Sequence, residues 1–186
     1  MFIVYFSKNL VNPFYYMSFG CKTHRGMLIL WCANALLKGE YELGQSAFIK
    51  LVPESTVQQI TLKDLKDKIH HYIDMTSKTG KQLSWDYADA AFPYTLVEKA
   101  ESEGKWFYLK GNDPKLYKYI IFGVGVEELE EADEKKQQHF IQVVLPEDGT
   151  HGDKGKANEF CKYLAKEYKG ELHLFNGRIM YYYPRK

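Results

Sequence analysis

The stretch KWFYLKGNDPKLYKYIIFGVGVEELEEADEKKQQHFIQVVLP, residues 105–146, decides the fold. It contains three runs rich in aromatic and β-branched residues, KWFYLK, YKYIIFGVGVEE and HFIQVVLP, and the run YTLVEK (94–99) precedes them. Four such runs with hairpin-length connections predict an antiparallel meander. The charged block EELEEADEKK, residues 127–136, is expected to be a solvated loop at the tip between two of the strands.

Residues before this stretch predict one more strand and two helices. SAFIKLV (46–52) alternates apolar and polar residues as a strand does. Thr61 is expected to cap a helix, with Asp64 at its third position as a weaker capping box and Gly80 beyond its end. SWDYADAAF (84–92) is ambiguous and is interpreted as a short helix begun by Ser84.

Residues after the stretch predict a second helix and a hairpin. The helix is expected from about Asp153 to Tyr168, because apolar residues recur there at helical spacing, and Gly170 is expected to terminate it. ELHLFNGRIMYYY (171–183) predicts a β-hairpin that turns at Asn176-Gly177. Helices segregated from a run of antiparallel strands indicate an α+β fold: two layers, a mostly antiparallel sheet, two main helices and a C-terminal β-hairpin.

Composition excludes several classes of protein. With 45% hydrophobic residues the 186-residue chain can form a core, and its net charge of +1 gives no general attraction to nucleic acid or anionic membrane. No apolar run reaches the roughly 18 residues of a membrane span. Three widely spaced cysteines argue against a disulfide framework and favour a cytoplasmic location.

The composition changes near residue 44. Residues 1–44 show neither a sustained helical nor a sustained strand period, so we expect an N-terminal extension followed by a single α+β domain, residues 45–186. One interpretation is a misassigned start, because KGE at 38–40 is what an in-frame ribosome-binding sequence encodes and Leu43 follows at a plausible distance for an alternative start codon. The other is a partly ordered N-terminal arm.

The stretch EDGTHGDKGKANEF, residues 147–160, is the one candidate for anion binding. Its glycines precede a predicted helix start, where free backbone amides attract anions, and the candidate residues are His151, Gly152, Lys154 and Lys156. The spacing fits neither a Walker loop nor a dinucleotide fingerprint. Asp153 is expected to be the helix N-cap, and its carboxylate would then compete with an anion for the same amides.

Catalytic and metal signatures are missing from the sequence. The three cysteines and six histidines show neither Cys-x-x-Cys nor His-Glu-x-x-His spacing, and there is no Gly-x-Ser-x-Gly elbow. Cys161 lies on the apolar stripe of the second predicted helix, where a cysteine behaves as a small hydrophobe. We therefore predict no catalytic residue, no metal and no cofactor.

The C-terminal hairpin is a weaker candidate for single-stranded nucleic acid. Residues 151–186 contain eight Lys and Arg residues against four acids, and bases stack on aromatic rings that lie beside cations. The candidate residues are Arg178, Tyr181, Tyr183 and Arg185. The balanced charge of the remaining chain makes nucleic acid an unlikely partner.

GQSAFIKLVP, TSKTGKQLSW, HGDKGKANEFCKYLAK and GELHLFNGRIMYYYPR resemble a small family of uncharacterised bacterial proteins, a domain of unknown function from spore-forming Gram-positive bacteria. The resemblance covers about residues 45–186 and is most specific over the last 35 residues. It implies an α+β fold with a two-layer antiparallel sheet. It implies no activity and no catalytic residues, and the family's members begin near Gln45.

The sequence leaves three functions open. We expect a cytoplasmic, non-enzymatic binding or protein-interaction domain, which could form homo-oligomers through a sheet face that helices leave uncovered. The alternatives are an anion-binding protein or enzyme that uses the 150–156 loop, and single-stranded nucleic-acid binding through the C-terminal hairpin.

Overall fold

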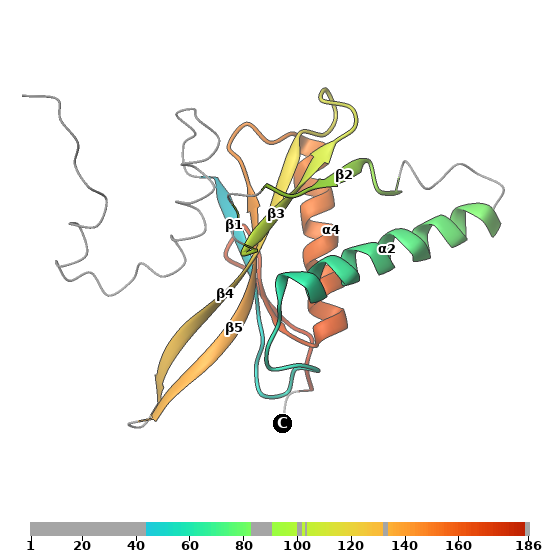
Figure 1. Cartoon of the computed structure of the whole chain (residues 1–186). Helices are drawn as coiled ribbons and strands as arrows, with labels where there is room; N and C mark the ends of the chain where they lie inside the picture. Colours follow the sequence, from blue (N-terminus) through green and yellow to red (C-terminus); the bar gives the residue numbers. More distant parts are fainter. Residues whose placement is uncertain (1–43, 83–90, 100–101, 103, 132–133, 185–186) are drawn as a thin grey trace, which may run out of the picture.

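The described part of the protein folds into an antiparallel sheet with two helices on one of its faces (Figure 1). A computed structural model describes residues 44–82, 91–99, 102, 104–131 and 134–184. The N-terminal extension up to residue 43, residues 84–90 of the short helix expected after Ser84, and Arg185 lie outside the described residues. The predicted two-layer α+β fold is confirmed.

The described sheet has seven strands in the order β2-β3-β4-β5-β1-β6-β7, and every neighbouring pair is antiparallel. The four predicted meander strands are present and adjacent. β1 enters between β5 and β6, so it joins the meander to the C-terminal hairpin. The strands are β1 (Gln45–Lys50), β2 (Tyr94–Val97), β3 (Trp106–Gly111), β4 (Tyr119–Glu131), β5 (Glu134–Leu145), β6 (Glu171–His173) and β7 (Ile179–Tyr181).

The first described helix, α2 (Leu62–Gln82), begins with the predicted capping box. The Thr61 N–H donates to Asp64 Oδ2 at 2.9 Å, and the Asp64 N–H donates to Thr61 Oγ1 at 3.2 Å. The helix does not stop before Gly80, as we predicted, but continues past it to Gln82. A glycine inside a helix costs only about 1 kcal/mol, so it does not by itself end one.

The second, α4 (His151–Tyr168), begins two residues earlier than predicted. Its N-cap is Thr150, and Asp153 is the third helical residue, so our assignment of Asp153 as N-cap is wrong by position. At the other end, Lys169 rather than glycine adopts the left-handed conformation, with φ 50° and ψ 44°. Gly170 is required for close approach instead, because a Cβ there would lie 2.9 Å from Ile49 Cγ2 and from Lys50 O.

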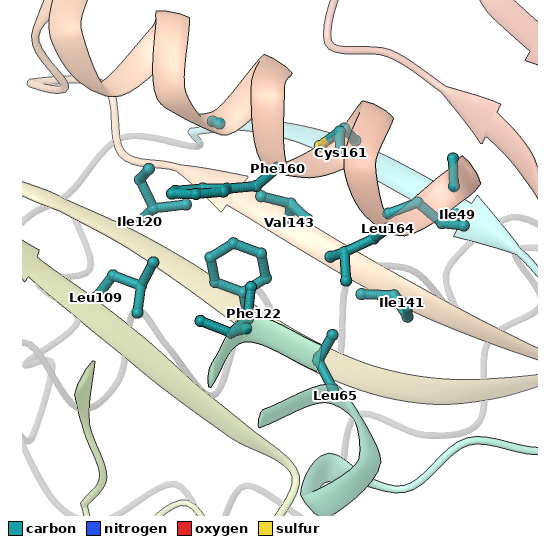
Figure 2. Close-up of a cluster of buried hydrophobic side chains, with 14 of the residues drawn as sticks. Ile49, Leu65, Leu109, Ile120, Phe122, Ile141, Val143, Phe160, Cys161 and Leu164 are labelled. Carbon is teal, nitrogen blue, oxygen red and sulfur yellow. The ribbon is translucent and has the colours of Figure 1, made fainter. Parts of the chain in front are cut away.

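The hydrophobic core lies between the sheet and the helices. Figure 2 shows Phe160, Cys161 and Leu164 of α4 over the strands, with Leu65 of α2 beside Phe122. All five of these side chains are fully buried. Phe160 and Phe122 pack edge to face with centroids 6.1 Å apart. The apolar stripe predicted for the second helix is therefore the part of α4 that faces the sheet.

The charged block at 127–136 is not the solvated loop that we predicted. β4 and β5 continue through most of it as a two-stranded ribbon that extends beyond the other strands (Figure 1). Four successive pairs place each of residues 127–130 opposite Gln or Lys, and like charges meet in the last pair, Glu131 opposite Glu134. A charged segment can form strands where most cross-strand neighbours do not repel.

The C-terminal hairpin is present, and its turn is one residue longer than Asn176-Gly177 alone. The Gly177 N–H donates to Leu174 O at 2.9 Å, and the Leu174 N–H donates to Arg178 O at 2.9 Å. Gly177 has φ 77°, which is the left-handed residue that closes a three-residue hairpin loop.

Candidate functional site

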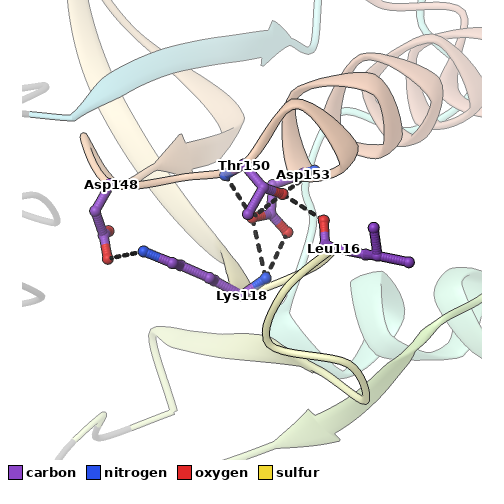
Figure 3. Close-up of polar contacts among 5 residues, drawn as sticks. All are labelled: Leu116, Lys118, Asp148, Thr150 and Asp153. Atoms are coloured by element: carbon purple, nitrogen blue, oxygen red, sulfur yellow. Dashed lines mark hydrogen bonds and ion pairs between the residues drawn. The ribbon is translucent and has the colours of Figure 1, made fainter.

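The start of α4 is organised around the fully buried carboxylate of Asp153 (Figure 3). Oδ1 accepts from the Tyr94 hydroxyl at 2.8 Å, and both oxygens accept from the Lys118 N–H at 3.0 and 3.1 Å. Oδ2 also accepts from the Thr150 N–H at 2.9 Å. These donors satisfy a charge that would otherwise be costly to bury. Asp153 thus joins α4 to β2 and to the start of β4.

A loop before β4 covers the same helix end. The Thr150 hydroxyl lies 2.6 Å from Leu116 O and 2.9 Å from Asp153 Oδ2, and it accepts from the Asp153 N–H at 3.0 Å. A Cβ at Gly152 would overlap Leu116 O and lie 2.7 Å from the Tyr117 ring. Gly152 therefore allows the loop to pack against the helix. This packing explains the glycine without a bound phosphate.

The predicted anion-binding residues do not converge on one point. His151 and Lys154 are exposed in the first turn of α4. The Lys156 ammonium donates to Ala91 O at 2.8 Å and to Glu159 Oε2 at 2.9 Å. Lys156 therefore holds the segment before β2 against α4, next to the Tyr72 hydroxyl that donates to the same carboxylate. Anion binding at residues 150–156 stays a prediction without a built site.

A second candidate surface lies on the face of β1, β6 and β7 that points away from the helices. Ile49 and Leu172 belong to the core under α4, so the alternate side chains of their strands point to the opposite face. We call this surface the hairpin face. Its residues are Phe48, Lys50, Glu171, His173, Ile179, Tyr181 and Tyr183.

Register places the residues of the hairpin face in two rows across the strands. Phe48 lies opposite His173, which lies opposite Ile179; Lys50 lies opposite Glu171, which lies opposite Tyr181. Ile179 and Tyr181 are 41% and 39% exposed, so the outermost strand has its largest apolar side chains in contact with solvent. Phe48 lies further inward on the same face, beyond His173, and its ring packs edge to face on Phe140 at 5.9 Å.

The charged groups of the hairpin face are already paired. Lys50 Nζ contacts Glu127 Oε1 at 2.7 Å, and His173 Nε2 lies 2.7 Å from Glu171 Oε1. The Tyr183 hydroxyl donates to Glu171 Oε2 at 3.1 Å. Burial, and then this hydrogen bond, raise the pKa of Tyr183 and keep it protonated. A partner of this surface therefore need not supply counter-charges.

The nucleic-acid candidates are only partly brought together. Tyr181 and Tyr183 both lie on the hairpin face, but their rings pack edge to face, 5.8 Å apart and at 89°. Two rings in that arrangement do not form a parallel platform for successive bases. Arg178 is exposed in the turn, and its backbone N–H donates to Asn176 Oδ1 at 3.1 Å. Nucleic-acid binding also stays a prediction.

Reactive side chains contribute no further site in the described part of the chain. Cys161 is fully buried, and burial raises the pKa of its thiol to about 12, so it is a poor nucleophile. Among the described residues no group of three or more His, Cys, Asp or Glu side chains is arranged to hold a metal ion.

A pocket of about 450 Å³ lies between the start of α2 and the end of α4. Hydrogen bonds from the Thr61 hydroxyl and N–H lower the pKa of Asp64, which caps α2, and Lys68 pairs with Glu167 at 2.9 Å. The two pocket-lining charges Asp64 and Lys68 therefore already have partners on the helices. The lining residues are Val57, Gln59, Ile60, Asp64, Asp67, Lys68, His71 and Tyr168.

Comparison with known proteins identifies the family of this chain. A family model for a domain of unknown function, DUF1885, matches residues 45–184. The chain belongs to the DUF1885 family. The resemblance to an uncharacterised family from spore-forming bacteria is thereby confirmed, and the family's function is unknown.

One solved structure similar to this DUF1885 protein is a protein of unknown function from Bacillus stearothermophilus. The two sequences are 41% identical over 68% of this chain and 91% of that chain, with a TM-score of 0.39. No curated protein matches the sequence. None of the described helices is long and apolar enough to cross a membrane.

Two residues of the hairpin face, Tyr181 and Tyr183, were among the candidates predicted from the sequence, and the others were not. The alternation of SAFIKLV marks Phe48 and Lys50 as one side of a strand, but it does not say which side the helices cover. Glu171 and His173 become neighbours of that strand only through the long-range pairing of β1 with β6.

Proposed function

We propose that this DUF1885 protein is a non-enzymatic interaction domain that binds another protein through the hairpin face. The supporting observation is the exposure of Ile179 and Tyr181 in the outermost described strand, on a face that neither described helix covers. Exposed apolar and aromatic side chains with a polar rim are typical of protein interfaces. Lys50, paired with Glu127, and Glu171, bonded to His173 and to Tyr183, supply the polar groups of this face.

The chemistry of the surface favours a protein over an anion or a nucleic acid. Its lysine, Lys50, is already paired with Glu127, whereas nucleic-acid binding depends on cations that face phosphates. Tyr and Ile on adjacent rows offer apolar area at low entropic cost, and completing the burial of each is worth about 1 kcal/mol. We further propose that the protein works in the cytoplasm, where the buried Cys161 thiol would stay reduced.

A photo-crosslinking amino acid placed at Tyr181 tests the proposal in living cells that express the full chain. We expect one discrete crosslinked product, and none when the same group replaces His70, which is exposed on α2. The product should disappear in Ile179→Lys and persist in Val126→Lys, a matched control at a 44%-exposed apolar residue of β4. No product at Tyr181, or equal products at Tyr181 and His70, would refute the function.

A further inference from the structure

The pocket between the start of α2 and the end of α4 has the size of a small-molecule site. Its volume is about 450 Å³, and sites for small ligands are typically about 300–1,000 Å³ with a largely apolar lining. Ile60 and Tyr168 are buried in its wall, and Val57 is a large hydrophobic residue that stays 39% exposed. A ligand in the pocket would therefore cover apolar surface that is now in contact with water.

The charges around this pocket are not balanced. Its lining contains one lysine, Lys68, and two carboxylates, Asp64 and Asp67. Glu167 lies 2.9 Å from the Lys68 ammonium and neutralises it. Asp64 accepts only from the uncharged N–H and hydroxyl of Thr61, and these hydrogen bonds lower its pKa, so it keeps its negative charge. The lining therefore presents a net negative charge to the pocket.

Asp67 is the carboxylate that is available to a ligand. Within the described residues it takes part in no hydrogen bond and no ion pair. It precedes His71 by about one helical turn of α2, and both residues line the pocket. An ion pair with Asp67 would therefore not require an existing pair to break.

The hydroxyl of Tyr168 lies in the same negative field. Burial and then the charge of Asp64 raise the pKa of Tyr168, and Glu167 and Asp67 act in the same direction. Carboxylates that oppose a further negative charge at this position attract a positive one. In the part of the chain that the structure describes, no three His, Cys, Asp or Glu side chains are arranged to hold a metal ion, so an organic cation fits better.

We propose that this pocket binds a small organic cation, with an ammonium or guanidinium group on a short aliphatic chain. The charged group would pair with Asp67, and the chain would cover Val57 and Ile60. An anion fits less well, because the lysine of the pocket is already paired with Glu167. This inference goes beyond the proposed interaction function and does not depend on it, since the pocket and the hairpin face share no residue.

An NMR titration of the ¹⁵N-labelled full chain with n-pentylamine tests the inference at about pH 7.5, where the amine is protonated. The second cation is n-butylguanidine, and pentan-1-ol and pentanoate are the neutral and anionic probes of similar size. We expect both cations to shift the amide signals of Ile60, Asp67 and His71 with a Kd of about 1–10 mM, as ligands of so few atoms bind. Pentan-1-ol should bind at least about fivefold more weakly, and pentanoate should cause no shift.

Two carboxylate variants of α2 separate a specific site from a general attraction to negative charge. Asp67→Asn removes the pairing charge and should raise the Kd of n-pentylamine at least about fivefold. Asp74→Asn makes the same change about two turns further along the helix, outside the pocket lining, and should leave the Kd unchanged. Both residues are exposed, so both variants should stay folded, and circular dichroism checks this.

Four results would overturn the inference. They are no shift with either cation, equal affinity for n-pentylamine and pentan-1-ol, binding of pentanoate in place of the cations, and equal losses in Asp67→Asn and Asp74→Asn. None of them affects the crosslink expected from Tyr181, and a missing crosslink would leave the cation site intact. The two proposals can therefore fail separately.

Discussion

Replacing Asp153 by alanine should remove much of the protein's stability. The carboxylate accepts hydrogen bonds from the Tyr94 hydroxyl and from the N–H groups of Lys118 and Thr150. Asp153→Ala leaves these three donors without an acceptor in a site that is closed to solvent. At about 1–1.5 kcal/mol for each donor, the free energy of unfolding should fall by about 3–5 kcal/mol. Total stabilities of single domains are only about 5–15 kcal/mol.

Urea denaturation followed by tryptophan fluorescence measures this loss as a lower midpoint at unchanged slope. Tyr94→Phe removes one of the three donors, so its cost should be about 1–1.5 kcal/mol. Asp148→Ala is the matched control, because it breaks only the exposed pair with Lys118 and should cost less than about 1 kcal/mol. A loss below 1 kcal/mol for Asp153→Ala would refute the role of this carboxylate.

Three further outcomes follow from the structure. Gly152→Ala should lower the free energy of unfolding by about 2 kcal/mol, because the added Cβ would overlap Leu116 O. Gly155→Ala should raise it by up to about 1 kcal/mol, because a Cβ there has no neighbouring atom within 4 Å. Urea denaturation measures both changes. In a Cys21→Ser, Cys32→Ser background, Cys161 should react with a thiol reagent at pH 8 only as fast as the protein unfolds, because burial raises its pKa to about 12; rapid labelling of the native protein would contradict this. Burial also raises the pKa of Tyr163 to about 12. The stability that the protonated phenol contributes should therefore be complete below about pH 10 and be lost as the pH rises toward 12. A urea midpoint that stays constant up to about pH 12 would contradict this prediction.

Local features of the fold could be predicted from the sequence, because neighbouring residues determine them. Thr61 and Asp64 form their capping box within four residues, and the Asn176-Gly177 turn is equally local. The start of α4 could not be predicted from neighbouring residues alone, because Thr150 and Asp153 are both suitable N-cap residues. In the structure Thr150 is the N-cap, its hydroxyl bonds to Leu116 O, and Asp153 accepts from the Lys118 N–H; both partners lie more than 30 residues away.

The candidate site depends on long-range pairing, which sequence periodicity does not contain. β1 could be recognised as a strand, but its position between β5 and β6 could not, and that position brings Phe48 next to His173. The prediction of a loop at residues 127–136 was wrong for a related reason. A run of charged residues is typical of a loop, and only the pairing with β5 shows that Glu127 and Glu128 each lie opposite a glutamine.

Crosslinking from the hairpin face tests the central claim most directly. With the photo-crosslinking amino acid at Tyr181, we expect one discrete product in cells, which is lost in Ile179→Lys and kept in Val126→Lys. No product at Tyr181, or an equal product from the exposed His70 position of α2, would contradict the account.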